Sequence, residues 1–224
     1  GLPPRAGRVV VFALRNRQLV QSRSITPPPP RSIGEFGFSV AISKRNEQPV
    51  LLVGEPGGGA NAAGRAHVFV YDSQSQTWVG EQSLSPNGPA LAGDSFGWSV
   101  ALSGDRAVVG APLGLQTGYA DLFEFSPQGW LPDRRHTTSQ VGSDCGFSVA
   151  VSADHTAVGS PGWDGGQGRL DVLRHQGSTS PVLTSEGVDM GQLGYSVDVR
   201  ESGIDTRVLA GKPEARSSGA VEMY

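Results

Sequence analysis

The stretch Phe96-Gly97-Trp98-Ser99-Val100, followed after a short gap by Gly110-Ala111-Pro112, is the clearest copy of a repeat that runs through this 224-residue chain. Its pattern is a glycine, an aromatic residue and Ser-Val, and then Gly-x-Pro, and it occurs four times. The first glycine of each copy is Gly37, Gly97, Gly146 or Gly194, so the copies are 60, 49 and 48 residues apart. A period near fifty residues indicates a stack of similar supersecondary units.

Each copy contains segments with strand character. In the copy that begins at Phe96, large and small residues alternate with a period of two, as they do in a strand. Tight turns with Gly or Asp separate the segments, and Pro112 ends the second one because proline cannot donate to a ladder. The four predicted strands are residues 97–102, 107–111, 119–125 and the segment around Trp130.

The opening of the third strand recurs five times, after Gly7, Gly64, Gly118, Gly168 and Gly219. This series sets the phase of the repeat. We expect complete blades at 31–90, 91–140 and 141–187, the end of a blade at 1–30 and a partial blade at 188–224. Four-stranded antiparallel units of this length are typical of β-propellers. We therefore predict an all-β fold, an incomplete propeller, in which Phe38, Trp98, Phe147 and Tyr195 pack between blades.

Residues 94–112 resemble an FG-GAP repeat, whose name comes from Phe-Gly and Gly-Ala-Pro; both are literal here. Such repeats build the seven-bladed propeller of integrin alpha subunits and of many microbial and algal extracellular proteins. The resemblance extends over nearly all of 1–224, as a single propeller segment, and implies an extracellular or cell-surface location. Seven blades of this period need roughly 350 residues. We expect the chain to belong to a longer protein or to self-associate through its open blade edges.

The chain departs from the integrin pattern in the loops between strands one and two, where integrin-type repeats often carry a calcium site. Calcium needs several hard oxygen ligands from one loop. The corresponding loops, 43–48, 103–106, 152–155 and 200–205, lack the three-carboxylate spacing. We predict no metal and no cofactor, with Asp105 and Asp154 as turn formers. The chain resembles the calcium-free bacterial-type repeat, in which a Trp, here Trp78 or Trp130, marks strand four.

Composition and motifs exclude several other functions. The net charge is −3 and there is no long basic run, so we expect no nucleic-acid partner. The chain contains no run of 18 apolar residues, so we predict no transmembrane helix. The single cysteine, Cys145, predicts a buried small hydrophobe, with a reactive thiol as the alternative. The four histidines share no metal-ligand spacing and predict exposed or packing roles, and the chain has no nucleophile elbow or P-loop, so we predict no enzyme.

The best candidates for ligand binding lie in the loops between strands two and three. In the family that the chain resembles, these loops share one face with the loops between strands four and one, and that face binds partners. Trp163 is flanked by glycines beside Asp164 and Gln167, which suits recognition of a carbohydrate or a protein. The alternative is a Trp that folds back over its own blade. Arg216 is a weaker candidate.

These features predict a non-catalytic extracellular recognition or adhesion module that binds a protein or a glycan through one loop face. One alternative is a lectin with a sugar pocket on each blade. Another is an accessory propeller of a larger secreted enzyme. Fold alone cannot choose among these functions, because function depends on the loops that the blades carry.

Overall fold

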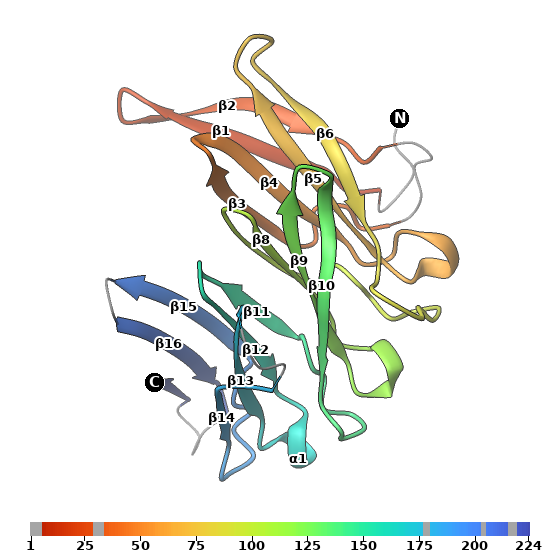
Figure 1. Cartoon of the computed structure of the whole chain (residues 1–224), viewed down its shortest axis with the longest axis vertical. Coiled ribbons are helices and arrows are strands. Elements are labelled where there is room, and N and C mark those ends of the chain that lie inside the picture. The colour runs from red at the N-terminus through yellow and green to blue at the C-terminus, as the bar shows by residue number, and fades with distance from the viewer. Residues whose placement is uncertain (1–5, 29–33, 177–179, 203–204, 215–218) are drawn as a thin grey trace.

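A computed structural model describes residues 6–28, 34–176, 180–202, 205–214 and 219–224. In this part of the chain, five antiparallel sheets follow one another in sequence order (Figure 1). The first sheet pairs β1 (Val9–Arg15) with β2 (Gln18–Ile25). The second contains β3 (Val40–Arg45), β4 (Gln48–Glu55), β5 (Arg65–Asp72) and β6 (Thr77–Leu84).

The remaining sheets repeat this arrangement. The third contains β7 (Ser99–Ser103), β8 (Arg106–Ala111), β9 (Tyr119–Ser126) and β10 (Gly129–Thr137). The fourth contains β11 (Ser148–Val151), β12 (His155–Ser160), β13 (Arg169–Arg174) and β14 (Leu183–Glu186). The last contains β15 (Ser196–Ser202), β16 (Asp205–Lys212) and β17 (Ala220–Met223). The predicted all-β fold of incomplete propeller blades is confirmed.

Strand boundaries in the third sheet agree with the sequence pattern, with one difference. β8 ends at Ala111, directly before Pro112, as expected. β10 continues to Thr137, well beyond the Trp130 segment that the sequence indicates. A register shift between Pro132 and Arg134 lets the strand pass the proline and continue to pair with β9.

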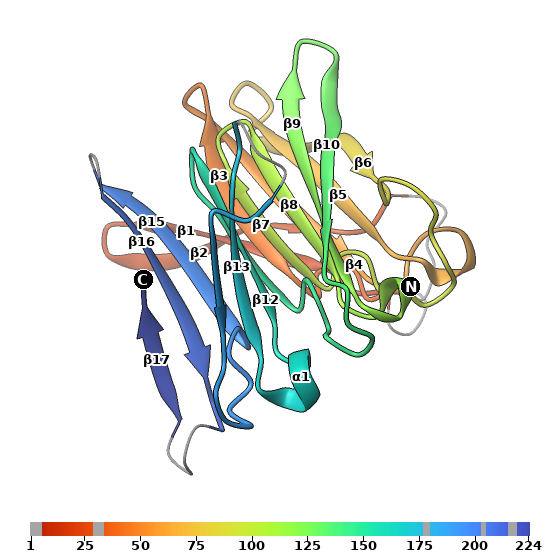
Figure 2. The ribbon, with the colours of Figure 1, turned by 60° about the horizontal axis from the view of Figure 1, so that its bottom comes forward.

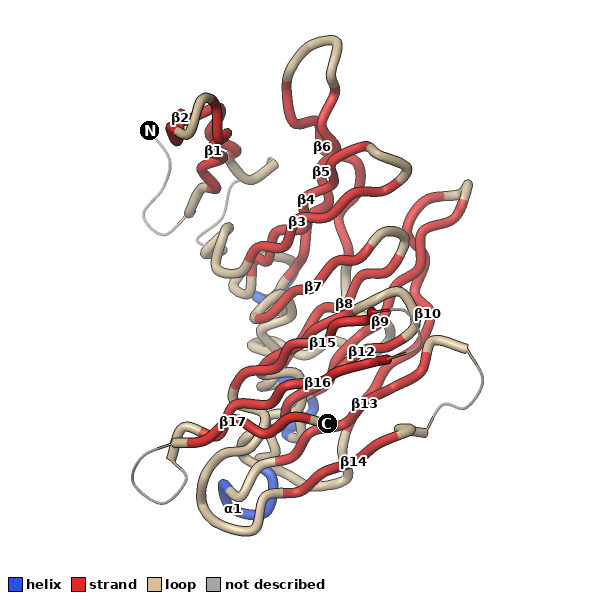
Figure 3. The backbone as a smooth tube through the Cα atoms, turned by 90° about the vertical axis from the view of Figure 1, so that its left-hand side faces the viewer, coloured by secondary structure: helices blue, strands red, loops and turns tan. Residues whose placement is uncertain are grey.

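Successive sheets stack face to face, as the views in Figures 2 and 3 show. The first strands of neighbouring sheets, β3, β7, β11 and β15, lie next to one another. The rings of Phe38, Trp98, Phe147 and Tyr195 form a row along them, with centroid distances of 4.7, 5.7 and 4.9 Å. These contacts confirm that the four aromatic residues pack between blades.

We call the contact between two successive sheets a joint, and the three joints among the second to fifth sheets use the same close backbone approach. In one joint, Ser99 Oγ donates a hydrogen bond of 2.7 Å to the carbonyl of Gly146. A Cβ on Gly110 would lie 2.0 Å from that same oxygen, so the repeat requires glycine there. Gly54 and Gly159 stand in the same relation to Gly97 and Gly194. The glycine of Phe-Gly and the glycine of Gly-x-Pro therefore recur together because the backbones of neighbouring blades meet at these two positions.

Apolar side chains fill the joints. The joint between the second and third sheets buries Leu52, Val68, Phe96, Val109 and Trp130, among others. Cys145 is fully buried at the next joint beside Val108, Leu122 and Val158, which agrees with the predicted small hydrophobe. Among the described residues, no helix is long and apolar enough to span a membrane.

Candidate recognition face

Three single helical turns lie between the second and third strands of successive sheets. They are η1 (Ala60–Ala62), η2 (Gly114–Gln116) and α1 (Trp163–Gly166). Each turn contains residues with positive φ, beginning at Asn61, Leu115 or Asp164. Strand direction alternates within each sheet, so these turns lie on the same side of the blades as the connections that lead into β7, β11 and β15. We call this side the loop face.

Backbone hydrogen bonds join each turn to the connection that enters the next blade. The Gly93 N–H donates to the Ala62 carbonyl at 3.2 Å, and the Gly142 N–H donates to the Gln116 carbonyl at 2.8 Å. The Gln192 N–H likewise donates to the Gly166 carbonyl at 2.9 Å. The turns and connections therefore form one continuous surface across the blades.

The predicted site residues Trp163, Asp164 and Gln167 lie together on this surface. The side-chain amide of Gln167 donates to Asp164 Oδ2 at 2.6 Å, and the Asp164 N–H donates to Gln140 Oε1 at 2.9 Å. The guanidinium of Arg169 lies 4.5 Å from the centre of the Trp163 indole. One face of the indole is thus covered by a residue of the same blade, while the side chain stays partly exposed. Their role in binding remains a prediction, and Arg216 lies outside the described residues.

Sequence reasoning missed an apolar component of the loop face. Six large apolar side chains in its turns and connections are exposed to solvent: Leu91, Leu113, Leu115, Val141, Val188 and Met190. They follow the backbone links, since Val141 precedes the glycine bonded to η2 and the Met190 methyl lies near Gly166 of α1. Single exposed apolar residues are ordinary, whereas contiguous apolar patches are typical of interaction surfaces, so these loops are candidates for one. The sequence could have indicated them, because these apolar residues lie in segments that it predicts as loops.

A buried polar network supports the connection that carries Leu91. Asp121 on β9 accepts a hydrogen bond of 2.6 Å from the Asn87 N–H, and Arg135 binds both of its carboxylate oxygens. The Tyr119 hydroxyl donates to Asp94 at 3.1 Å. Burial, and next the negative charge of Asp94, raise the pKa of Tyr119, so its hydroxyl stays a donor. These bonds hold the connection in place beneath its exposed apolar side chain.

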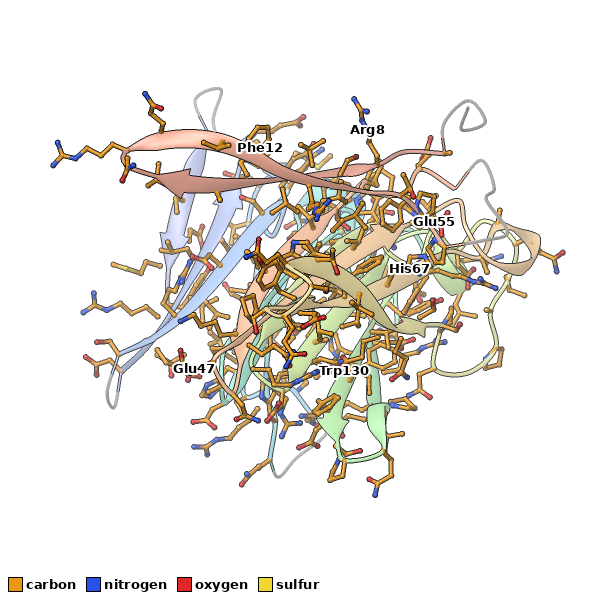
Figure 4. All side chains as sticks on the ribbon, turned by 90° about the horizontal axis from the view of Figure 1, so that it is seen from above. Arg8, Phe12, Glu47, Glu55, His67 and Trp130 are labelled. Atoms are coloured by element: carbon orange, nitrogen blue, oxygen red, sulfur yellow. The ribbon has the colours of Figure 1, made fainter. Side chains whose placement is uncertain are left out.

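On β5 the repeat position of Asp121 is occupied by His67. Here the third strand carries the imidazole, and its partner, Glu55, carries the carboxylate. His67 Nε2 lies 2.8 Å from Glu55 Oε2, and Nδ1 lies 2.9 Å from Ser83 Oγ. Figure 4 shows Glu55 and His67 side by side. His67 and His136 are both buried and face carboxylates, which the sequence pattern alone did not indicate. Within the described ranges, no group of three or more His, Cys, Asp or Glu residues is placed to hold a metal ion.

Comparison with known families gives one match. Residues 78–120 match the model of the FG-GAP repeat. This segment runs from the first residues of β6 to the start of β9 and includes both Phe96-Gly97 and Gly110-Ala111-Pro112. No curated protein matches the chain.

Proposed function

We propose that this chain, an FG-GAP repeat protein, is a non-catalytic recognition module that binds its partner through the loop face. The observation that carries the proposal is the group of exposed apolar side chains on adjoining turns and connections. Rigid blades hold these loops in place, and binding residues are commonly carried by loops on such a scaffold. The resemblance to integrin-type propellers supports a role in adhesion outside the cell or at its surface.

A protein is the partner that this surface suits best. Leu115, Val141 and Met190 are flexible or branched aliphatic side chains, and apolar contact at the centre of an interface is typical of protein recognition. Polar groups stand beside them, including the Asp164 carboxylate and the Gln167 amide. Such a mixture of an apolar centre and polar surroundings supports a specific protein interface.

A glycan is the second candidate, and Trp163 is the residue that favours it. A partly exposed indole beside an acid and an amide is suited to stacking on a sugar ring and to bonding its hydroxyls. The three turns carry different residues at their first positive-φ position, Asn61, Leu115 and Asp164. This difference argues against one sugar pocket repeated on each blade.

The test is to probe an array of extracellular protein domains and a glycan array with the labelled 224-residue chain. The variant combines Leu115→Asp, Val141→Asp and Met190→Asp. The matched control combines Val79→Asp and Leu131→Asp, which are also exposed but lie near the opposite ends of β6 and β10. We expect a protein ligand whose binding falls at least tenfold in the loop-face variant and is unchanged in the control.

Other outcomes separate the candidates. Binding to a glycan that is lost in Trp163→Ala, but kept in the aliphatic variant, would replace the protein partner by a carbohydrate. Equal loss in the loop-face variant and in the control, with both folded by circular dichroism, would remove the loop face as the site.

A further inference from the structure

Three polar residues of the second sheet form a chain of hydrogen bonds that runs from a buried carboxylate to a surface hydroxyl. As described above, the two ring nitrogens of His67 face Glu55 Oε2 and Ser83 Oγ, at 2.8 and 2.9 Å. Glu55 and His67 are only 5% and 3% exposed, whereas Ser83 is exposed to solvent. The second sheet has four strands, and described sheets pack against both of its faces. We call Glu55, His67 and Ser83 the serine triad.

The bonding pattern assigns a different role to each ring nitrogen of His67. An ionised carboxylate only accepts hydrogen bonds, so the neutral imidazole carries its proton on Nε2 and donates it to Glu55. Nδ1 then has a free lone pair, which accepts a hydrogen bond from the Ser83 hydroxyl. An imidazole held in this way by a carboxylate can take the proton of a hydroxyl as its oxygen attacks, which is how serine nucleophiles are activated.

The repeat itself does not require the serine triad, because the next two blades carry other residues at all three positions. The equivalents of Glu55, His67 and Ser83 in the third and fourth sheets are, respectively, Ala111 and Ser160, Asp121 and Asp171, and Arg135 and Thr184. In both of those sheets the third strand carries a carboxylate that an arginine binds. The second sheet keeps the same strand order but replaces this ion pair by a hydroxyl, an imidazole and a carboxylate.

A second hydroxyl–imidazole pair shows what a purely structural version of this contact looks like. Thr156 Oγ1 lies 2.9 Å from His175 Nε2, and His175 Nδ1 lies 2.8 Å from the Ala153 carbonyl oxygen. Thr156 is fully buried, and burial lowers the pKa of His175, which disfavours the protonated imidazole. Of the two such pairs within the described residues, that of Ser83 is the one that combines a carboxylate behind the imidazole with a hydroxyl open to solvent.

A small cavity lies against the reacting end of the serine triad. Its volume is about 260 Å³, and His67 and Ser83 are among its lining residues. Pockets for drug-sized ligands span about 300 to 1,000 Å³, so this cavity suits a smaller molecule. Phe69 and Gly80 give it an apolar wall, and the Glu81 carboxylate lies at its border. A short, neutral acyl group is therefore the substrate that fits, since an anionic one would meet the charge of Glu81.

Acyl transfer also places negative charge on the carbonyl oxygen of the substrate. Among the described strands, β6 has a neighbour on one side only, so its outer edge presents main-chain N–H groups that no ladder uses. Residues 80–83 of this strand line the same cavity. Main-chain N–H groups are the usual donors to such an oxyanion.

We propose that Ser83 is an activated nucleophile that accepts a short, neutral acyl group from an ester. Ser83 Oγ attacks the carbonyl carbon of the ester, and its proton passes to His67 Nδ1. The bond between the carbonyl carbon and the alcohol oxygen then breaks, and the departing alcohol takes the proton from the imidazole. Glu55 positions the ring and stabilises its transient positive charge. This inference goes beyond the proposed function and does not depend on it, because its product is an acylated side chain and not a complex at the loop face.

Reaction with p-nitrophenyl acetate tests the proposal. The 224-residue chain is incubated with this ester, the release of p-nitrophenolate is followed by absorbance, and the acetylated residue is located by peptide mass spectrometry. We expect acetylation of Ser83 to be about 100-fold faster than that of Ser85, an exposed serine two residues further along the chain. Ser83→Ala should abolish the fast release, and the matched control Ser85→Ala should leave it unchanged.

Two further variants test the roles of the buried residues. His67→Gln should slow the acetylation of Ser83 by about 100-fold, because the general base is lost. Glu55→Gln keeps an acceptor for the Nε2 proton but removes the charge, and should slow the reaction by about tenfold. Circular dichroism and a thermal melt establish which variants are folded.

The proposal is overturned if Ser83 in the wild type reacts no faster than Ser85, since Ser83 is then an ordinary surface hydroxyl. A folded His67→Gln variant that reacts as fast as the wild type overturns it as well. If His67→Gln does not fold, an unchanged rate in Glu55→Gln has the same meaning.

Discussion

Two neighbouring joints share their backbone contacts but are closed on their outer side by different chemistry. Between β6 and β10, the Trp130 indole N–H donates to Glu81 at 2.9 Å, and the Arg45 guanidinium lies 3.6 Å from the centre of the Phe125 ring. Between β10 and β13, His136 lies 3.1 Å from the carboxylate of Asp171. The first joint combines aromatic rings with the Arg45–Glu81 ion pair, whereas the second is closed by an imidazole and a carboxylate without such rings. A common backbone register therefore leaves the side chains of each joint free to differ.

The greatest loss of stability should follow from removing Trp130, the aromatic residue at the first of these joints. Trp130 is almost fully buried, and its backbone exchanges two hydrogen bonds with the Gln82 side chain. Trp130→Ala should lower the free energy of unfolding by about 4 kcal/mol, the typical cost of a large cavity in a core. Urea unfolding followed by circular dichroism measures it.

Trp78→Ala is the matched control, because Trp78 marks the same strand in the preceding blade but is only partly buried. We expect about half the loss or less. Equal losses at both positions would mean that the aromatic contacts of the first joint do not distinguish it.

The second effect concerns the joint that contains His136 and Asp171. Burial opposes ionisation of Asp171, but hydrogen bonds from His136, Arg169 and Thr184 outweigh it, so its pKa lies below the ordinary value. A lowered folded-state pKa contributes stability above the pKa of the unfolded chain, and this is lost as the pH falls through the folded-state value. Asp171→Asn should therefore cost about 3 kcal/mol at pH 7 and progressively less below pH 4. Urea unfolding from pH 3 to pH 8 checks this dependence.

Asp121 is the repeat equivalent of Asp171, and its pH dependence should have the opposite sign. Burial raises the pKa of Asp121 even though Arg135 binds it, while Asp121 raises the pKa of Arg135 against the burial of the guanidinium. A raised folded-state carboxyl pKa means that the wild type gains stability from this group as the pH falls through that value. Asp121→Asn should cost about 2 kcal/mol at pH 7. The cost should grow, not shrink, towards pH 4; parallel profiles for the two variants would contradict the comparison.

The last prediction concerns the reaction rate of the Cys145 thiol, which reports on opening of the joint that contains His136 and Asp171. Burial raises the pKa of the Cys145 thiol to about 12, so the native thiol is neither accessible nor ionised at neutral pH. Its reaction with a disulfide reagent should require opening of the joint. We expect the rate to rise in Asp171→Asn through opening of this joint, and to rise in Trp130→Ala only as far as its loss of global stability requires. A fast reaction in the wild type would show that this joint opens readily.

The sequence predicts the blades well because their determinants are local. Each determinant predicts one local feature: the glycines predict a close backbone approach, the proline after Ala111 predicts the end of a strand, and the alternation around Trp98 predicts a strand. Because the repeat presents these features several times, the prediction is strengthened. The ion pairs are different. The spacing of strand three places Asp121 and Asp171 at the same position, but their partners, Arg135 on the following strand and His136 on the neighbouring blade, depend on contacts that the pattern does not specify.

The candidate site likewise has one part that the sequence predicts and one part that depends on contacts between segments. Trp163 was recognisable as a Trp without a repeat position, whereas the contact of its indole with Arg169 arises from the positive-φ residues of α1, which bring the turn back over β13. The exposed aliphatic group depends on which connections meet on one face. That information comes from backbone bonds between blades and is absent from any single repeat.

The serine-to-carbonyl bond in the joints among the second to fifth sheets has an evolutionary consequence. Its acceptor is a main-chain oxygen, so it does not depend on the side chains of the receiving blade, apart from the accepting residues Gly97, Gly146 and Gly194, which have positive φ and leave no room for a Cβ. The glycine at the close approach and the donating serine are constrained, while the connecting turns can vary in sequence without altering how blades stack. Such an architecture permits duplication of whole units and divergence of their surface loops, and a lineage could acquire new binding specificities without redesigning the scaffold.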